Sequence, residues 1–261
     1  MSQVVLANYD SERQLFAELL VPSSPKRILL FQGESGIGKS TLLRSCAELI
    51  PASAKFIPIE LRGAAVSISE IFYRFAGRLD WTQLENFCHQ LVAMEPAVAT
   101  TLDRNHLTGI RNQINITLSS QGLIDRSERI AALTEALFRD LESLHNLVVL
   151  TFDTFDNAST EASEWLSGPL LERMARTKNA RVVIAGKTVP NINNIEWGAF
   201  CEIRMLSGIV AADPWLAIIE KLRKIIPHHS GGGWMSGVCD ALNGNPAKIM
   251  QVIEGLPTRE Q

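Results

Sequence analysis

The sequence predicts an α/β protein in which helices cover both faces of a parallel sheet, followed by a smaller all-helical unit. Five apolar runs of strand length alternate with segments whose apolar residues recur at helical spacing, and strands separated by helices form parallel sheets. The strand pattern ends near residue 206, and only helical patterns follow. The 261 residues, 46% of them hydrophobic, suffice for one large and one small domain. We therefore expect domains at 1–206 and 207–261.

Local patterns place the individual elements along the chain. Each expected strand is a short run rich in Val, Ile, Leu and Phe, and each expected helix repeats apolar residues at i, i+3 and i+4. Residues 96–122 have too weak a pattern to be assigned. The expected strands are 27–31, 56–61, 147–152, 181–185 and 201–205, and the expected helices are 10–20, 41–50, 68–79, 128–144, 161–176, 213–226 and 234–253.

Composition excludes several classes of protein. The charged fraction of 20% and the net charge of −3 exclude a disordered chain and give no overall attraction to nucleic acid or to anionic lipid. The four cysteines form no CxxC pair. Neither a secretory signal nor an apolar run of about 20 residues is visible. We expect a soluble, cytoplasmic protein without a membrane partner.

A glycine-rich segment between the first strand and the next helix matches G-x-x-x-x-G-K-[ST] at every fixed position. Glycines let the main chain turn its amides inward around a polyphosphate, and the helix adds its positive N-terminal end. Lys39 supplies a point charge for the β- and γ-phosphates, and the Ser40 hydroxyl can ligate Mg²⁺. We expect ATP or ADP with Mg²⁺ as cofactors, bound by Gly33, Glu34, Ser35, Gly36, Ile37, Gly38, Lys39, Ser40 and Thr41.

An acidic pair follows the strand at 147–152. A phosphate-binding loop needs a carboxylate at the end of a neighbouring strand to hold the hydrated metal ion, and Asp153 takes that position. Asp156, three residues on, is near enough to orient or deprotonate a water molecule. The alternative for Asp156 is a helix cap or a solvated turn.

Four motifs in order resemble the STAND branch of P-loop NTPases, which is related to AAA+ ATPases. They are GESGIGKST at 33–41, LVVLTFDTFD at 147–156, RVVIAGKT at 181–188 and GNP at 244–246. The first is specific for nucleotide binding, and the order of the other three supports the family. The resemblance spans essentially the whole chain. It implies a sheet of order 5-1-4-3-2 and a helical lid that closes over the nucleotide.

The resemblance also implies roles for single residues. Asp156 takes the catalytic acidic position beside Lys39 and Asp153, Lys187 takes the sensor position, and Pro246 packs near the adenine. Many relatives have Arg where Lys187 stands; Arg contacts phosphate through a planar fork, whereas Lys is a mobile point charge. Thr188 is an alternative sensor. The segment around Arg13 is expected to border the adenine.

The expected function is a signalling switch that binds ATP, hydrolyses it slowly and couples nucleotide state to self-association or to docking of a separate effector protein. Only about fifteen residues follow Pro246, so the sensing and effector units of larger relatives are expected on other polypeptides or to have been cut away. Two alternatives remain open. One is an AAA+-like regulator that acts on nucleic acid, and the other is a P-loop kinase for small molecules.

Overall fold

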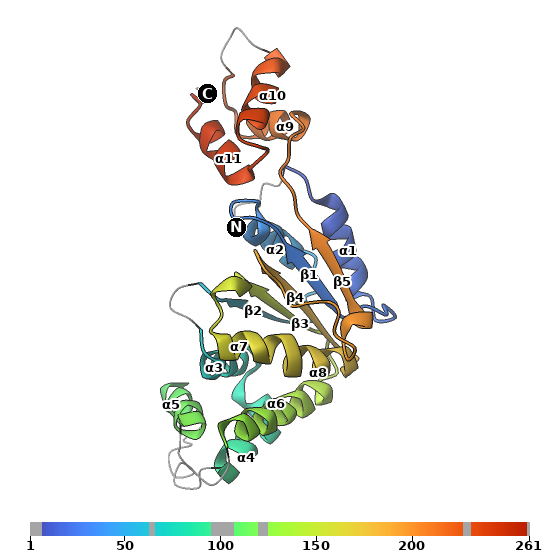
Figure 1. Ribbon diagram of the computed structural model, residues 1–261, viewed down its shortest axis with the longest axis vertical. Helices are drawn as coiled ribbons and strands as arrows, with labels where there is room; N and C mark the ends of the chain where they lie inside the picture. The colour runs from blue at the N-terminus through green and yellow to red at the C-terminus, as the bar shows by residue number, and fades with distance from the viewer. Residues whose placement is uncertain (1–6, 63–65, 95–106, 120–124, 227–230, 260–261) are drawn as a thin grey trace.

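The computed structural model describes residues 7–62, 66–94, 107–119, 125–226 and 231–259. A five-stranded parallel sheet lies at its centre, in the order β2-β3-β4-β1-β5 (Figure 1). Read from the other edge, this is the expected order 5-1-4-3-2, so the predicted fold class is confirmed. The strands are β1 (Ile28–Gln32), β2 (Lys55–Glu60), β3 (Val148–Asp153), β4 (Ala180–Gly186) and β5 (Cys201–Met205).

The burial of each strand agrees with its position in the sheet. All seven residues of the central strand β4 are buried, whereas the edge strands β2 and β5 each contain exposed residues. Strands buried on both faces read as continuous apolar runs, which is the pattern that predicted them. Along β1, Ile28 and Leu30 pack into one apolar core, and Leu29 and Phe31 pack into the other.

The edge strand β2 contains a proline without disturbing the sheet. The amides of Lys55 and Leu61 donate to carbonyl oxygens at the flanks and end of β3, at 2.8 and 2.9 Å. Alternate residues of a strand face alternate sides, so the nitrogen of Pro58 is directed away from β3. Proline lacks an N–H group and is tolerated at this outer position. In the same register, Glu60 pairs with Asp153.

Helices cover both faces of the sheet. The first core packs against the helices between residues 68 and 176. The second packs against the helices at 10–20 and 39–47 and against the C-terminal helices. Within the described residues, no helix has the length and apolar character needed to cross a bilayer. The helices of the core are α1 (Asp10–Leu20), α2 (Lys39–Ala47), α3 (Ile68–Leu79), α4 (Glu85–Met94), α5 (Leu107–Ser119), α6 (Arg126–Ser143), α7 (Thr160–Trp165) and α8 (Leu171–Arg176), with short helical turns at Trp81–Gln83, Phe155–Asn157, Leu166–Leu170 and Gly198–Phe200.

The three C-terminal helices are α9 (Asp213–Lys221), α10 (Gly231–Ala241) and α11 (Pro246–Glu254). They lie at one end of the molecule, and α4, α5 and α6 lie at the other (Figure 1). The prediction of a single helix at 234–253 is wrong, because α10 and α11 are separate helices. The chain turns at Gly244, which adopts φ +63°, and Pro246 begins α11. Pro at the first turn and Asn245 as the N-cap start α11. The expected helix at 213–226 ends early, at Lys221.

The link between β5 and α9 crosses the α10–α11 turn at very short range. A Cβ atom added at Gly244 would lie 2.7 Å from the amide nitrogen of Ile209, and one at Gly208 would lie 2.3 Å from the carbonyl oxygen of Asn243. The Ile209 amide donates to the Gly244 carbonyl at 2.7 Å. Trp215, which is 1% exposed, packs at this crossing and donates its ring N–H to the carbonyl oxygen of Ile209. The crossing therefore fixes how the C-terminal helices attach.

Gly244→Ala is expected to lower the free energy of unfolding by about 2 kcal/mol or more, because the new methyl group meets main-chain atoms at a left-handed φ. Gly237→Ala is the matched control. It lies inside α10 with nothing within 4 Å of the added atom, and should raise stability by up to about 1 kcal/mol. Thermal unfolding of both variants provides the measurement. Equal melting temperatures for the two variants would contradict the close approach of Gly244 to the main chain of residues 208–209.

Candidate functional site

The glycine-rich loop lies between the end of β1 and the start of α2, where the sequence predicts it. Gly36 and Gly38 adopt φ values of +81° and +96°, which other residues rarely adopt. The amide of Gly33 donates to the carbonyl of Gly186 at the end of β4. Because α2 begins at Lys39, directly after the loop, the positive end of that helix faces the space that the loop encloses.

Lys39 reaches back across this loop. Its Nζ donates to the carbonyl oxygens of Gly33 and Glu34, at 2.5 and 2.8 Å. Burial lowers the pKa of Lys39, while the carboxylates of Asp156, Asp153 and Glu34 act in the opposite direction. The ammonium group is thus held inside the loop by neutral acceptors, which a phosphate oxygen can replace with a stronger, charged partner.

The acidic pair lies across from Lys39. Asp153 ends β3 and is 17% exposed, and Asp156 lies in the turn that follows. The Asp156 Oδ1 atom accepts a hydrogen bond from the main-chain N–H of Lys187 at 2.7 Å. This bond fixes the direction of the Asp156 carboxylate and ties the turn after β3 to the turn after β4. A carboxylate held in this way can orient a water molecule.

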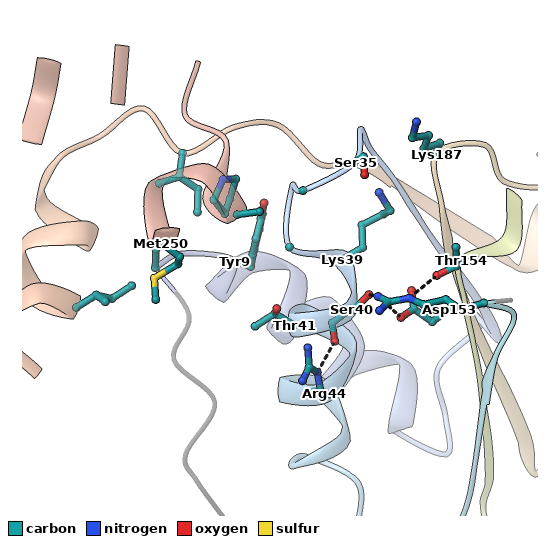
Figure 2. A pocket seen from close by; sticks show the side chains of 18 of the residues that line it. Tyr9, Ser35, Lys39, Ser40, Thr41, Arg44, Asp153, Thr154, Lys187 and Met250 are labelled. Atoms are coloured by element: carbon teal, nitrogen blue, oxygen red, sulfur yellow. Dashed lines mark hydrogen bonds and ion pairs between the residues drawn. The ribbon is translucent and has the colours of Figure 1, made fainter. Parts of the chain in front are cut away.

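The sensor candidates differ in their position. Lys187 lines the same cavity as Lys39, Asp153 and Asp156, whereas Thr188 is not among its lining residues (Figure 2). The Lys187 carbonyl accepts a hydrogen bond from the Gln32 side chain at 3.0 Å, so the turn is also tied to β1. Lys187 is thus the candidate that lines this cavity, and its role as a sensor stays a prediction.

The cavity has a volume of about 650 Å³, in the range of small-molecule sites. One side is polar and consists of the loop, the acidic pair and Lys187. The other side is mainly apolar and fits an aromatic base. Its lining residues include Ala7, Tyr9, Ile209, Trp215, Ile218, Pro246, Ala247 and Met250. Pro246 lines this apolar side, and its contact with adenine stays a prediction. The N-terminal segment contributes Ala7 and Tyr9 to the lining, and Arg13 is not among the lining residues.

The C-terminal helices are hydrogen-bonded directly to the phosphate-binding loop. The Asn245 side chain donates to the Ser35 carbonyl at 3.2 Å, and the Ala247 amide donates to the Gly36 carbonyl at 3.0 Å. A Cβ atom at Gly36 would lie 2.8 Å from the Asn245 side chain. Sequence reasoning missed Asn245, although its position before Pro246 marks it as a helix cap.

Tyr9 adds a third contact to the loop. Its hydroxyl donates to the carbonyl of Ile37 at 2.6 Å and lies 3.3 Å from the carbonyl of Ser207, in the link to the C-terminal helices. Tyr9 itself has a left-handed φ of +92° and is 6% exposed. No periodic or motif signal in the sequence marks this residue, because its partners lie 28 and 198 positions away.

Ser40, in α2, and Asp153, at the end of β3, both line this cavity (Figure 2). One nitrogen of the Arg62 guanidinium, Nη2, lies 2.7 Å from Ser40 Oγ and 3.7 Å from Asp153 Oδ2. A hydroxyl and a carboxylate are oxygen ligands of the kind that Mg²⁺ takes, so the chemistry of this pair fits the ion. Within the described part of the chain, no three His, Cys, Asp or Glu side chains gather as a metal site. Mg²⁺ needs no such cage, because it keeps waters and binds phosphates.

Solved structures share this fold. A Walker-type ATPase of Pyrococcus abyssi matches with a TM-score of 0.52 and 15% identity, over 95% of this chain and 67% of its own. The ORC1 protein of Aeropyrum pernix in complex with DNA gives 0.51 and 15%, over 96% and 59%. CDC6P from Pyrobaculum aerophilum gives 0.48 and 16%, over 95% and 62%. This chain thus spans about three fifths to two thirds of their lengths.

The sheet order and the glycine-rich loop define a P-loop ATPase. Residues 10–184 match the AAA ATPase domain family, and the chain belongs to that family. A search of curated proteins found no match.

Tyr9→Phe is expected to lower the free energy of unfolding by about 1 kcal/mol at neutral pH, because the bond to Ile37 is lost. Burial, with a smaller effect of Glu12, raises the pKa of Tyr9 to about 12, above the value of about 10 in an unfolded chain. The contribution of the Tyr9 hydroxyl to the free energy of unfolding is therefore complete below about pH 10 and is lost as the pH rises toward about 12. Urea unfolding of both proteins should show the difference in stability narrowing over that window. A difference that stays constant would show that the hydroxyl is not buried.

Proposed function

We propose that this chain is a nucleotide-dependent switch of the STAND type, in which ATP binds between the phosphate-binding loop and the C-terminal helices. Residues 1–206 form the core and 207–261 the lid. Lys39 contacts the β- and γ-phosphates, Ser40 and Asp153 hold Mg²⁺, and Pro246 packs against the base. The bound Mg²⁺ supplies charge neutralisation for the phosphates.

The observation that carries this proposal is the set of hydrogen bonds between the lid and the loop carbonyls. From the lid, the Asn245 side chain and the Ala247 amide donate to the carbonyls of Ser35 and Gly36. Tyr9, from the core, donates to the carbonyl of Ile37. A nucleotide engages the amides of the same peptides from the other side. A change in the loop when nucleotide binds is therefore transmitted to the lid. The coupling is reciprocal, because a lid position that favours one nucleotide state is itself favoured by that state.

Hydrolysis is expected to be slow. Asp156 orients the attacking water, and Lys187 interacts with the γ-phosphate. Asp156 lies on a turn after β3 and has one carbon fewer than Glu, so it holds the water less closely. A slow reaction suits a switch, since the ATP state must last long enough for a partner to bind. We propose self-association or docking of an effector protein as the output.

The nucleic-acid alternative has one point in its favour, which is the fold shared with a DNA-bound ORC1 protein. The net charge of −3 offers no general attraction to the phosphate backbone. The alternative predicts faster hydrolysis in the presence of DNA, whereas the switch predicts no effect. The kinase alternative predicts phosphoryl transfer to a small acceptor.

Lys39→Ala should weaken ATP binding at least about 100-fold, because it removes the charge that the loop directs at the phosphates. Asp156→Ala should leave ATP affinity within about threefold of wild type and lower turnover about 100-fold. Calorimetric titration with ATP and a phosphate-release assay test both variants. Tight ATP binding by Lys39→Ala would refute the site.

Nucleotide state is expected to change the assembly or shape of the protein. Light scattering coupled to size exclusion, run with ATP, with ADP and without nucleotide, should separate at least two states. Asn245→Ala should bind ATP but lose most of this difference, since it removes the side chain that joins the lid to Ser35. Lys248→Ala, one turn along α11, is the control and should behave like wild type. An Asn245 variant with an unchanged response would contradict the coupling.

A further inference from the structure

Arg62 lies two residues after the end of β2, and its side chain lies between the two oxygens assigned to Mg²⁺. Its Nη2 donates to Ser40 Oγ at 2.7 Å and lies 3.7 Å from Asp153 Oδ2. Nε of the same guanidinium lies 3.0 Å from Glu60 Oε1. One guanidinium group thus bridges α2, which follows the glycine-rich loop, and the ends of β2 and β3.

The sheet positions this side chain. Glu60 pairs in register with Asp153, and the amide of Leu61 donates to the Asp153 carbonyl at 2.9 Å. Arg62 therefore leaves the sheet two residues beyond the last paired position, next to the acidic end of β3. Its side chain is still 57% exposed, so solvent weakens the ion pairs and the group can move away.

A guanidinium and Mg²⁺ compete for the same oxygens. Both favour an ionised carboxylate, but Mg²⁺ is smaller, doubly charged and bound at about 2 Å, so the two cannot share the space between Ser40 and Asp153. Mg²⁺ can enter only when the guanidinium group leaves.

We propose that Arg62 is a positioning residue that stands in for the metal ion: it neutralises Asp153 when Mg²⁺ is absent and must be displaced when the metal arrives. The proposal rests on the nucleotide site described above. It assigns to Arg62 control of how strongly Mg²⁺ and nucleotide binding depend on one another.

This role has effects of opposite sign in the two metal states. Without Mg²⁺, Arg62 shields the phosphates from the Asp153 carboxylate, so its removal weakens nucleotide binding. With Mg²⁺ present, removal of Arg62 means that the metal ion no longer has to displace the guanidinium group. The metal ion, and the nucleotide bound with it, then bind more tightly. The coupling factor, which is the ratio of the two affinities, rises.

The test is calorimetric titration of the full chain with ADP, in EDTA and in excess Mg²⁺. Arg62→Ala is expected to bind ADP about threefold more weakly in EDTA and about threefold more tightly with Mg²⁺, the size expected for exposed ion pairs. Arg62→Lys keeps the charge without the fork and should lie between wild type and Arg62→Ala. ADP is the probe because no hydrolysis accompanies its binding.

Arg44→Ala is the matched control. Arg44 lines the same cavity and donates to the main-chain oxygen of Ser40, so its loss removes the same charge from the cavity. It should shift both affinities in the same direction and leave their ratio unchanged. Arg62→Gln carries the same expectation as Arg62→Ala if the latter proves unstable.

An unchanged ratio in the Arg62 variants, or a parallel shift of both affinities, would overturn the proposal while leaving the nucleotide site intact. Absence of ADP binding by the wild-type protein in either metal state would instead refute the proposed function, and the Arg62 proposal with it.

Discussion

The parallel pairing of β1, β3 and β4 is the constraint on which the rest of the structure depends. Parallel strands end at the same edge of the sheet, so segments far apart in the sequence meet there. The loop after β1, Asp153 after β3 and Lys187 after β4 are brought to one cavity in this way. Hydrogen bonds between the turns then fix their relative positions, above all the bond from the Lys187 amide to Asp156.

The phosphate-binding loop has two faces, and each has its own partner. Its amides and Lys39 surround the space for phosphate, whereas its carbonyls are bound by Tyr9, Asn245 and Ala247. The loop thus contributes main-chain groups to both faces, amides to one and carbonyls to the other. Gly36 is therefore constrained both by its conformation and by the close approach of Asn245, whereas Gly38 is constrained by its conformation alone.

Local and long-range features differ in how well the sequence predicts them. The buried strands were predicted to within one or two residues because an apolar run bounded by turn residues is a local signal, as at Val148–Asp153. The break at Gly244-Asn245-Pro246 was missed, although Gly, a capping residue and Pro are visible there. Arg62 and Tyr9 could not be found in this way, because their partners at Asp153 and Ser207 are set by the sheet and by the lid.

The proline in β2 limits how copies of this protein can meet. An uncovered sheet edge offers a row of main-chain donors and acceptors to any neighbouring chain. Since the outward nitrogen of Pro58 carries no hydrogen, a continuous ladder of hydrogen bonds cannot form along that margin. Pro58 therefore disfavours pairing of a further strand along β2, as prolines on edge strands do in other sheets.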